Sequence, residues 1–278
     1  MIRFGFSTCP NDTYAYHALL SGDVPSHDPE LSYELGDVQE LNERLARGEL
    51  DVAKVSFHAA LSMAADHVVL PVGSAIGFGV GPVLLAGPDS REGGDPPRVL
   101  CPGEQTTATL LYRLFHAGEG RVEQTIFDRI LPALERGEAD LGVCIHEGRF
   151  VYERLGLRLV EDLGERWETE TGAPLPLGGI LARADLGDDV LRAVSARLGE
   201  SLDFAHAHPD ATLPTMRRYA QELDDDVIRA HVDLYVNEWT RDLGEVGRKA
   251  LRVMSLRAAQ AGLVPEGTPP LRVLEGAS

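Results

Sequence analysis

The stretch that decides the fold lies near the middle of the chain, where residues 139–150 have the sequence ADLGVCIHEGRF. Its apolar run from Leu141 to Ile145 follows a polar segment of helical spacing, which predicts a buried strand of a parallel sheet. His146, Glu147 and Arg149 come directly after that strand. Because the carboxyl ends of strands in open α/β sheets face the ligand crevice, we expect these side chains beside a small-molecule site.

His146 is the candidate general base of that site. An imidazole has an ordinary pKa of about 6.5, so it can take up a proton near neutral pH. The alternative is a histidine that only satisfies hydrogen bonds at a strand end. Cys144 is expected on the same strand face, but buried cysteines mostly behave as small hydrophobes. We therefore do not expect a thiolate nucleophile.

The segment before this strand has a counterpart earlier in the chain. Residues 45–51 (LARGELD) precede a strand predicted over 51–57, just as residues 134–140 (LERGEAD) precede the strand toward His146. A chance match is the alternative, but a true repeat would present Ser56 and His146 from corresponding strand ends. Lys54 is expected on the same face as Ser56 because strand side chains alternate. Lys54 could instead pair with a carboxylate at the surface.

The remaining pattern predicts an α/β chain of two lobes. Strands are expected at 2–6, 31–35, 51–57, 83–86, 98–101, 141–145, 157–162 and 180–183, with helices between them and four cover helices after residue 188. We expect a discontinuous lobe I over 1–88 and 179–278 and a lobe II over 95–175. Crossover segments near 77–97 and 172–180 would act as a hinge. Ligand sites prefer the cleft between such domains.

Two helix starts carry polar residues next to that cleft. Asn11 or Asp12 is expected to cap a helix over 13–20, and either side chain could also touch a ligand. Thr106 or Thr107 is expected to cap a helix over 108–115. Its first amide hydrogens would point outward and form an anion site.

Composition excludes several classes of function. The net charge of −18 argues against a nucleic-acid partner, because phosphate binding needs a basic face. The three cysteines are far apart and no HExxH motif occurs, so we expect no metal site and a reducing compartment. The amino terminus enters a strand-like pattern directly, and glycines and prolines interrupt the apolar stretch 68–86. We therefore expect a cytoplasmic protein that does not bind a membrane.

Several motifs, taken with their order and spacing, carry a resemblance to a known family. They are FSTCPNDT at 6–13, KVS at 54–56, GVGP at 79–82, TTA at 106–108, IHEGRF at 145–150 and LPLG at 175–178, followed by AHV at 230–232 and YVN at 235–237. Together they resemble the 1,4-dihydroxy-6-naphthoate synthases of the futalosine route to menaquinone. The resemblance covers essentially the whole chain.

The resemblance implies the two-lobed fold of type II periplasmic binding proteins and a lyase without metal or organic cofactor. The implied reaction converts cyclic dehypoxanthine futalosine, a small anionic aromatic substrate, to 1,4-dihydroxy-6-naphthoate and a dihydroxyacetone fragment. Carried over onto this sequence, the proton acceptor is His146. The implied substrate-binding residues are Lys54, Val55, Ser56, Thr107 and Ala108.

Other positions remain open at this point. Asn11, Thr106, Glu147 and Arg149 are candidate supporting residues of the site. The family commonly has Ser where this chain has Gly148, which leaves a contact from that position in question. A chorismate dehydratase of the same pathway and a non-catalytic cytosolic binding protein for an anionic metabolite are the alternative functions. A homodimer is the candidate assembly.

Overall fold

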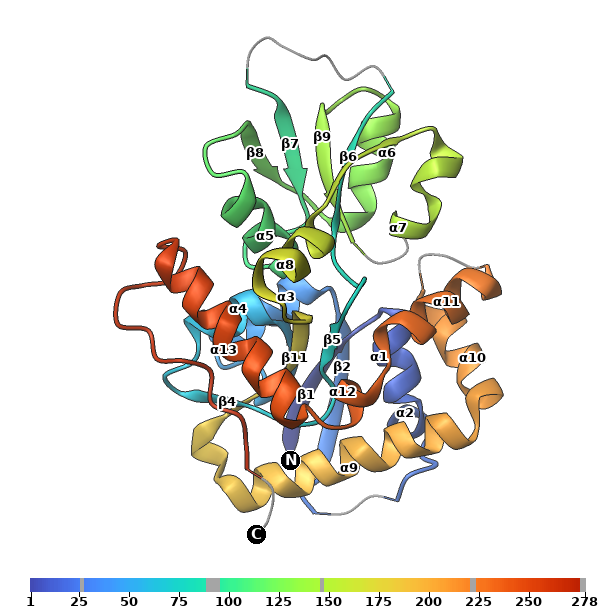
Figure 1. Ribbon diagram of the computed structural model, residues 1–278. Coiled ribbons are helices and arrows are strands. Elements are labelled where there is room, and N and C mark those ends of the chain that lie inside the picture. Colours follow the sequence, from blue (N-terminus) through green and yellow to red (C-terminus); the bar gives the residue numbers. More distant parts are fainter. Residues whose placement is uncertain (26–27, 89–95, 146–147, 221–223, 276–278) are drawn as a thin grey trace.

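The computed structural model describes residues 1–25, 28–88, 96–145, 148–220 and 224–275. Two mixed β-sheets lie one above the other, each with helices packed against it (Figure 1). We call the six-stranded sheet and its helices lobe I, and the five-stranded sheet and its helices lobe II. The chain passes from one lobe to the other twice, so lobe I is assembled from both ends of the sequence.

The six-stranded sheet of lobe I has the order β2-β1-β3-β11-β4, with β5 paired to β11. Its strands are β1 (Ile2–Ser7), β2 (Leu31–Gly36), β3 (Val52–Ser56), β4 (His67–Val69), β5 (Ala75–Gly77) and β11 (Leu175–Arg183). β1 runs parallel to β2 and β3, whereas β11 is antiparallel to β3, β4 and β5. The parallel strands β1 and β3 therefore end at the same edge of the sheet.

The five-stranded sheet of lobe II has the order β10-β6-β9-β7-β8. Its strands are β6 (Val83–Ala86), β7 (Arg98–Cys101), β8 (Arg121–Gln124), β9 (Leu141–Cys144) and β10 (Arg158–Asp162). The strand predicted over 141–145 is thus confirmed as β9. The prediction of a parallel sheet around it is wrong, because β9 pairs in parallel with β7 but antiparallel with β6.

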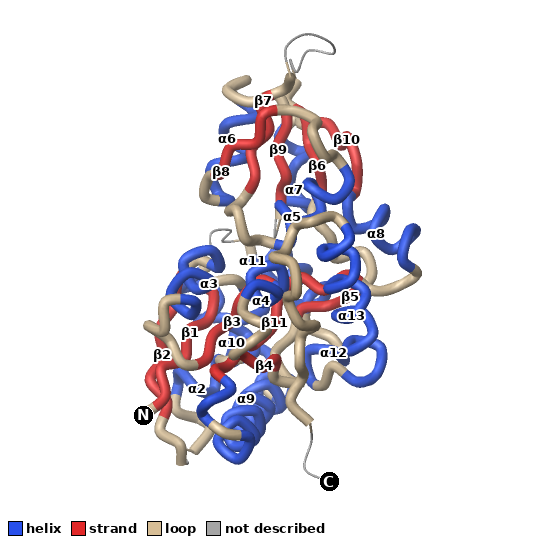
Figure 2. The backbone as a smooth tube through the Cα atoms, turned by 90° about the vertical axis from the view of Figure 1, so that its left-hand side faces the viewer, coloured by secondary structure: helices blue, strands red, loops and turns tan. Residues whose placement is uncertain are grey.

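Helices cover both sheets (Figure 2). Those of lobe I are α1 (Pro10–Ala15), α2 (His17–Ser21), α3 (Val38–Ala46), α4 (Phe57–Ser62), α9 (Asp188–Ala207), α10 (Pro209–Tyr219), α11 (Asp225–Tyr235), α12 (Glu238–Arg241) and α13 (Gly244–Gln260). Those of lobe II are α5 (Thr107–Phe115), α6 (Ile130–Glu135), α7 (Gly148–Val151) and α8 (Leu163–Thr171). Short 3₁₀ turns lie at Phe127–Arg129, Tyr152–Leu155 and Ala184–Leu186. None of the helices in the described part of the chain has the length and apolar character needed to span a membrane.

The first crossover falls within the predicted range 77–97, but the lobe assigned to the strand after it differs from the prediction. β6, expected in lobe I, pairs with β9 and β10 in lobe II, so the first passage between the sheets lies between β5 and β6. The second crossover segment, expected near 172–180, largely belongs to β11. Pro176 is tolerated there because β11 pairs with β3 only from Gly178 onward, and its register against β5 shifts between Pro176 and Gly178.

The first helix also begins earlier than predicted. α1 starts at Pro10 with Cys9 at the N-cap, so Asn11 and Asp12 lie inside the helix and do not cap it. Proline is favoured at the first helical position, where its fixed φ suits the helix and its missing N–H costs nothing. Both polar side chains are thereby buried and turned to other partners.

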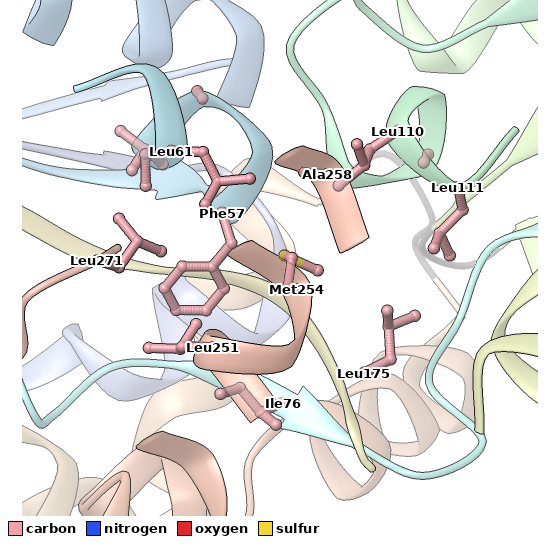
Figure 3. Packing of buried hydrophobic residues seen from close by; sticks show 14 of the residues in the cluster. Phe57, Leu61, Ile76, Leu110, Leu111, Leu175, Leu251, Met254, Ala258 and Leu271 are labelled. Atoms are coloured by element: carbon pink, nitrogen blue, oxygen red, sulfur yellow. The ribbon is translucent and has the colours of Figure 1, made fainter. Parts of the chain in front are cut away.

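One cluster of buried apolar residues includes side chains of both lobes, and we call it the shared apolar core. Phe57 of α4 and Met254 of α13 belong to the same buried cluster as Leu110 and Leu111 of α5, as Figure 3 shows. This packing places the start of α5 in lobe II beside the carboxyl end of β3 in lobe I.

Candidate functional site between the lobes

A cavity lies between the two lobes and encloses about 670 Å³ of space, open solvent at its mouth included. Its wall combines strand ends and helix starts of both lobes with the two crossover segments. The lining residues are Ser7, Cys9, Asn11, Val38, Ser56, Ala75, Val80, Pro82, Thr106, Thr107, Ala108, Ile145, Leu177, Gly178, His231 and Tyr235.

The wall on lobe II is the first turn of α5. Thr106 is its N-cap, and the Thr106 hydroxyl accepts a hydrogen bond from the Thr109 amide at 3.2 Å and donates one to the Gly103 carbonyl at 2.9 Å. The amides of Thr107 and Ala108 follow the cap and have no acceptor within the helix. Because both residues line the cavity, the positive end of α5 is directed at it.

A chain of hydroxyl groups joins the lobes at this wall. The Thr107 hydroxyl donates to the Leu177 carbonyl at 2.7 Å, so the Ser56 hydroxyl is the donor in the 3.0 Å contact between Ser56 Oγ and Thr107 Oγ1. Ser56 Oγ in turn accepts from the His58 amide at 3.3 Å. Both hydroxyl hydrogens are therefore engaged within the protein. The first-turn amides of α5 are therefore the groups that can donate hydrogen bonds to an anion at this wall.

Lys54 does not reach the described wall of the cavity. Its ammonium group lies 2.5 Å from Asp12 Oδ1 and 3.1 Å from the Gly73 carbonyl oxygen. The Lys54 and Asp12 side chains are only 9% and 3% exposed, so this is a buried ion pair and not the surface pair considered from the sequence. Asp12 Oδ2 also accepts from the Ser7 hydroxyl at 2.6 Å. The ion pair thus supports residues of the wall from behind.

Val55 is likewise absent from the described wall. It alternates with Lys54 and Ser56 along β3, and its side chain is fully buried in the hydrophobic core. Of the residues expected to bind substrate, the structure brings Ser56, Thr107 and Ala108 to the cavity. Of the supporting residues, it brings Asn11 and Thr106.

His146 and Glu147 lie outside the described residues. Ile145, which directly precedes them, lines the cavity. Arg149 is described, and its guanidinium group donates to the Gly81 carbonyl and to Asp162 Oδ2, the latter at 3.2 Å. It links α7 to the first crossover and to the end of β10.

Position 148 has room for a side chain. A Cβ atom added to Gly148 would lie 3.4 Å from Cys144 Cβ and 3.5 Å from Leu131 Cδ1, which are ordinary contact distances. Gly148 is not among the residues lining this cavity. The difference from the common family form is therefore sterically neutral.

His231 is a residue of the site that the sequence analysis did not single out. Its Nε2 lies 3.0 Å from Asn11 Oδ1, and its ring centroid is 4.5 Å from that of Tyr235. In the sequence it lies within a helical pattern, 220 positions from Asn11. Its presence in the AHV motif at 230–232 is the signal that could have pointed to it.

The buried cysteines and the possible metal ligands of the described residues bear on thiolate and metal chemistry. Burial raises the pKa of the Cys101 thiol to about 12 and that of Cys144 well above its usual range. No group of three or more His, Cys, Asp or Glu side chains among the described residues is arranged to hold a metal ion.

Sequence comparison relates the chain to a biosynthetic family. The sequence profile of a family described as "Menaquinone biosynthesis" matches residues 2–260. A 1,4-dihydroxy-6-naphtoate synthase of Thermus thermophilus is 45% identical over 274 residues, covering 98% of this chain and 99% of the relative. A protein of the same name from Streptomyces coelicolor is 41% identical over 272 residues, covering 95% of each.

Solved structures show the same fold. A protein of Archaeoglobus fulgidus superposes with a TM-score of 0.88 at 31% identity, covering 94% of this chain and 98% of that one. The alkanesulfonate-binding protein SsuA of Xanthomonas axonopodis pv. citri gives a TM-score of 0.72 at 14% identity, covering 98% and 95%. The latter shows the periplasmic-binding-protein-like fold expected from the sequence. The near full-length match to the profile and to both synthases establishes that this chain belongs to the menaquinone-biosynthesis family of enzymes.

Proposed function

We propose that this lyase of menaquinone biosynthesis converts cyclic dehypoxanthine futalosine to 1,4-dihydroxy-6-naphthoate and a dihydroxyacetone fragment. The observation that carries the proposal is the cavity between the lobes, which joins an apolar wall to the first-turn amides of α5. This combination suits a substrate that has an aromatic ring and a carboxylate. The names of the two synthases that match over nearly their whole length support the same reaction.

The two parts of the substrate would meet different parts of the wall. The carboxylate would accept hydrogen bonds from the Thr107 and Ala108 amides, where the helix terminus favours negative charge. The aromatic ring would pack against Val38, Val80 and Leu177. Closure of the lobes over this arrangement would exclude water from the reacting carbons.

His146 is proposed as the base that begins the reaction. Its imidazole would take the proton from a carbon next to a carbonyl group, and the electron pair left behind would form an enolate. Cleavage of the neighbouring carbon–carbon bond is then favoured because the remaining ring becomes aromatic. General-base catalysis of this kind contributes about 10²- to 10⁴-fold to the rate. Support comes from Ile145, which brings the chain to the cavity wall directly before His146.

The test is turnover by the purified protein. It is incubated with cyclic dehypoxanthine futalosine under argon, and 1,4-dihydroxy-6-naphthoate is followed by mass and absorbance. We expect wild type to form the naphthoate and His146→Ala to bind substrate with kcat lowered about 10²- to 10⁴-fold. His17→Ala is the control, because His17 is a buried histidine outside the cavity wall.

The outcomes separate the alternatives. Bound substrate that is recovered unchanged from wild type would indicate a binding protein, and chorismate consumption would indicate the dehydratase. Equal turnover by His146→Ala and wild type would remove His146 from the mechanism. A cytoplasmic location and a homodimer are proposed with the function; fractionation of the native cells and light scattering test them.

A further inference from the structure

His231 lines the cavity and lies on a cover helix of lobe I that comes late in the sequence. It lies on α11, which packs against α1, and only 1% of its surface is exposed to solvent. Both His231 and its partner Asn11 line the cavity. The proposed mechanism uses neither side chain.

The hydrogen bonds around Asn11 determine which way its amide group faces. Asn11 Nδ2 is 3.0 Å from Asp12 Oδ1, the oxygen that also accepts from the Lys54 ammonium group. Because a carboxylate that faces an ammonium group acts as an acceptor, the NH₂ end of Asn11 must point to Asp12. The Asn11 oxygen therefore faces His231, and His231 Nε2 must carry a hydrogen in order to donate to it.

His231 is thus held in one tautomer by a buried chain of polar groups. The chain runs from the Lys54 ammonium through the Asp12 carboxylate and the Asn11 amide to the His231 ring. A ring fixed in this way loses little rotational freedom when a ligand binds, because the protein has already ordered it. Such pre-ordering is typical of groups that orient a substrate.

The composition of the cavity wall also distinguishes His231. Among its described residues there is no Asp, Glu, Lys or Arg side chain. The titratable side chains in that part of the wall are those of His231, Cys9 and Tyr235. Of these residue types, histidine is the one that ordinarily exchanges a proton near neutral pH. His231 and Asn11 form a polar corner in a wall that is otherwise apolar or lined by hydroxyl groups.

We infer that His231 is a second substrate-contacting residue of this enzyme and that Asn11 is its positioning residue. The inference rests on the proposed function. With the carboxylate on the α5 amides and the aromatic ring on the apolar wall, the oxygen-bearing, non-aromatic part of the substrate faces His231. Because Nε2 already donates to Asn11, the imidazole orients this part by accepting a hydrogen bond from one of its hydroxyl groups.

A double-mutant cycle in the full-length protein tests the inference. His231→Phe keeps a planar ring but cannot donate to Asn11, whereas His231→Gln keeps a side-chain N–H. We expect His231→Phe and Asn11→Leu each to lower kcat/KM about 10- to 100-fold, with His231→Gln retaining more activity than His231→Phe. The double variant should lose no more than the worse single variant, because residues that act as a unit are not additive.

A matched control separates this role from a structural one. His17 is also a buried histidine held by a side-chain hydrogen bond, with Nδ1 2.8 Å from Thr215 Oγ1, but it lies outside the cavity wall. His17→Phe should lower the unfolding temperature while kcat/KM stays within about twofold of wild type. If His17→Phe lowers kcat/KM as much as His231→Phe does, the loss in His231→Phe reflects general destabilisation and the inference is overturned.

A measurement in the absence of substrate tests the tautomer. In protein labelled with ¹⁵N-histidine, the His231 resonances are identified by their loss in His231→Gln. We expect a protonated Nε2 in wild type and a mixture of tautomers in Asn11→Leu. Adding cyclic dehypoxanthine futalosine under argon to the His146→Ala variant, which should bind it with little turnover, should shift the His231 resonances and leave those of His17 in place.

The results distinguish failure of the inference from failure of the proposed function. If wild type forms naphthoate and His231→Phe matches it, or the losses of the two single variants multiply, then the inference alone is wrong. If wild type neither forms nor binds the naphthoate, the proposed function fails and the role of His231 fails with it.

Discussion

At the scale of single residues, the side chains near the cleft divide into those that line it and those that hold the lining in place. Ser56 and Thr107 line the cavity, whereas Lys54 and Asp12 form an ion pair behind its wall. Breaking such a pair on one side leaves a buried charge without its partner, which commonly costs several kcal/mol. Loss of activity in a Lys54 variant would therefore not by itself indicate contact with substrate.

Cys144 provides a prediction at the residue scale. Burial raises the pKa of its thiol, so the group stays protonated at pH 8. We expect Cys144→Ala to retain kcat within about twofold of wild type. Iodoacetamide at pH 8, followed by peptide mass mapping, should modify Cys9 first, because Cys9 is partly exposed. Rapid labelling of Cys144 together with loss of turnover would contradict this and favour a thiolate nucleophile.

At the scale of elements, the first crossover passes α8 with almost no space between their backbones. A Cβ atom added to Gly81 would lie 2.2 Å from the Gly164 Cα atom and 2.6 Å from the Gly164 nitrogen. The obstructing atoms are backbone and cannot move aside as a flexible side chain can. Close approach of α8 to the crossover therefore depends on glycine at both positions.

We predict that Gly81→Ala destabilises the protein by about 1–3 kcal/mol or more, as overpacking does. Urea unfolding followed by circular dichroism measures the loss. Gly148→Ser is the matched control, since a side chain at that position meets only ordinary contacts. It should unfold within about 0.5 kcal/mol of wild type and retain turnover. Equal stability of Gly81→Ala and wild type would mean that the crossover and α8 can move apart freely.

At the scale of the whole molecule, the lobes meet through the shared apolar core and the hydroxyl chain from Ser56 through Thr107 to Leu177. Thr107→Val keeps the shape of the side chain but removes the hydroxyl that hydrogen-bonds to Ser56 Oγ and to the Leu177 carbonyl. We predict a loss of about 1–3 kcal/mol and a larger radius of gyration in solution scattering, because the bridge between the lobes is broken.

Thr109→Val is the control for this prediction. The Thr109 hydroxyl donates to the Gly103 carbonyl at 2.7 Å, a hydrogen bond within lobe II. This variant should lose comparable stability without a change in the radius of gyration. Identical scattering curves for the two variants would show that the hydroxyl chain does not hold the lobes together.

The sequence by itself determined the local elements and the family. The apolar run at 141–145 predicted β9, and the helix expected between the strands at 31–35 and 51–57 appears as α3 with Asp37 as its N-cap. Thr106, one of two residues considered, caps α5. Each of these signals lies within a few neighbouring residues, where periodicity and capping act directly. The ordered motifs likewise identified the family that the comparisons then showed.

Only the tertiary structure decided which elements meet. It placed β6 in lobe II, paired Lys54 with Asp12, drew Pro176 into β11 and set His231 beside Asn11. These pairings join residues that are distant in the sequence, and they depend on how the sheets and cover helices pack as a whole. No local pattern encodes such a choice, because strand and helix periods show which face is buried but not what is buried against it.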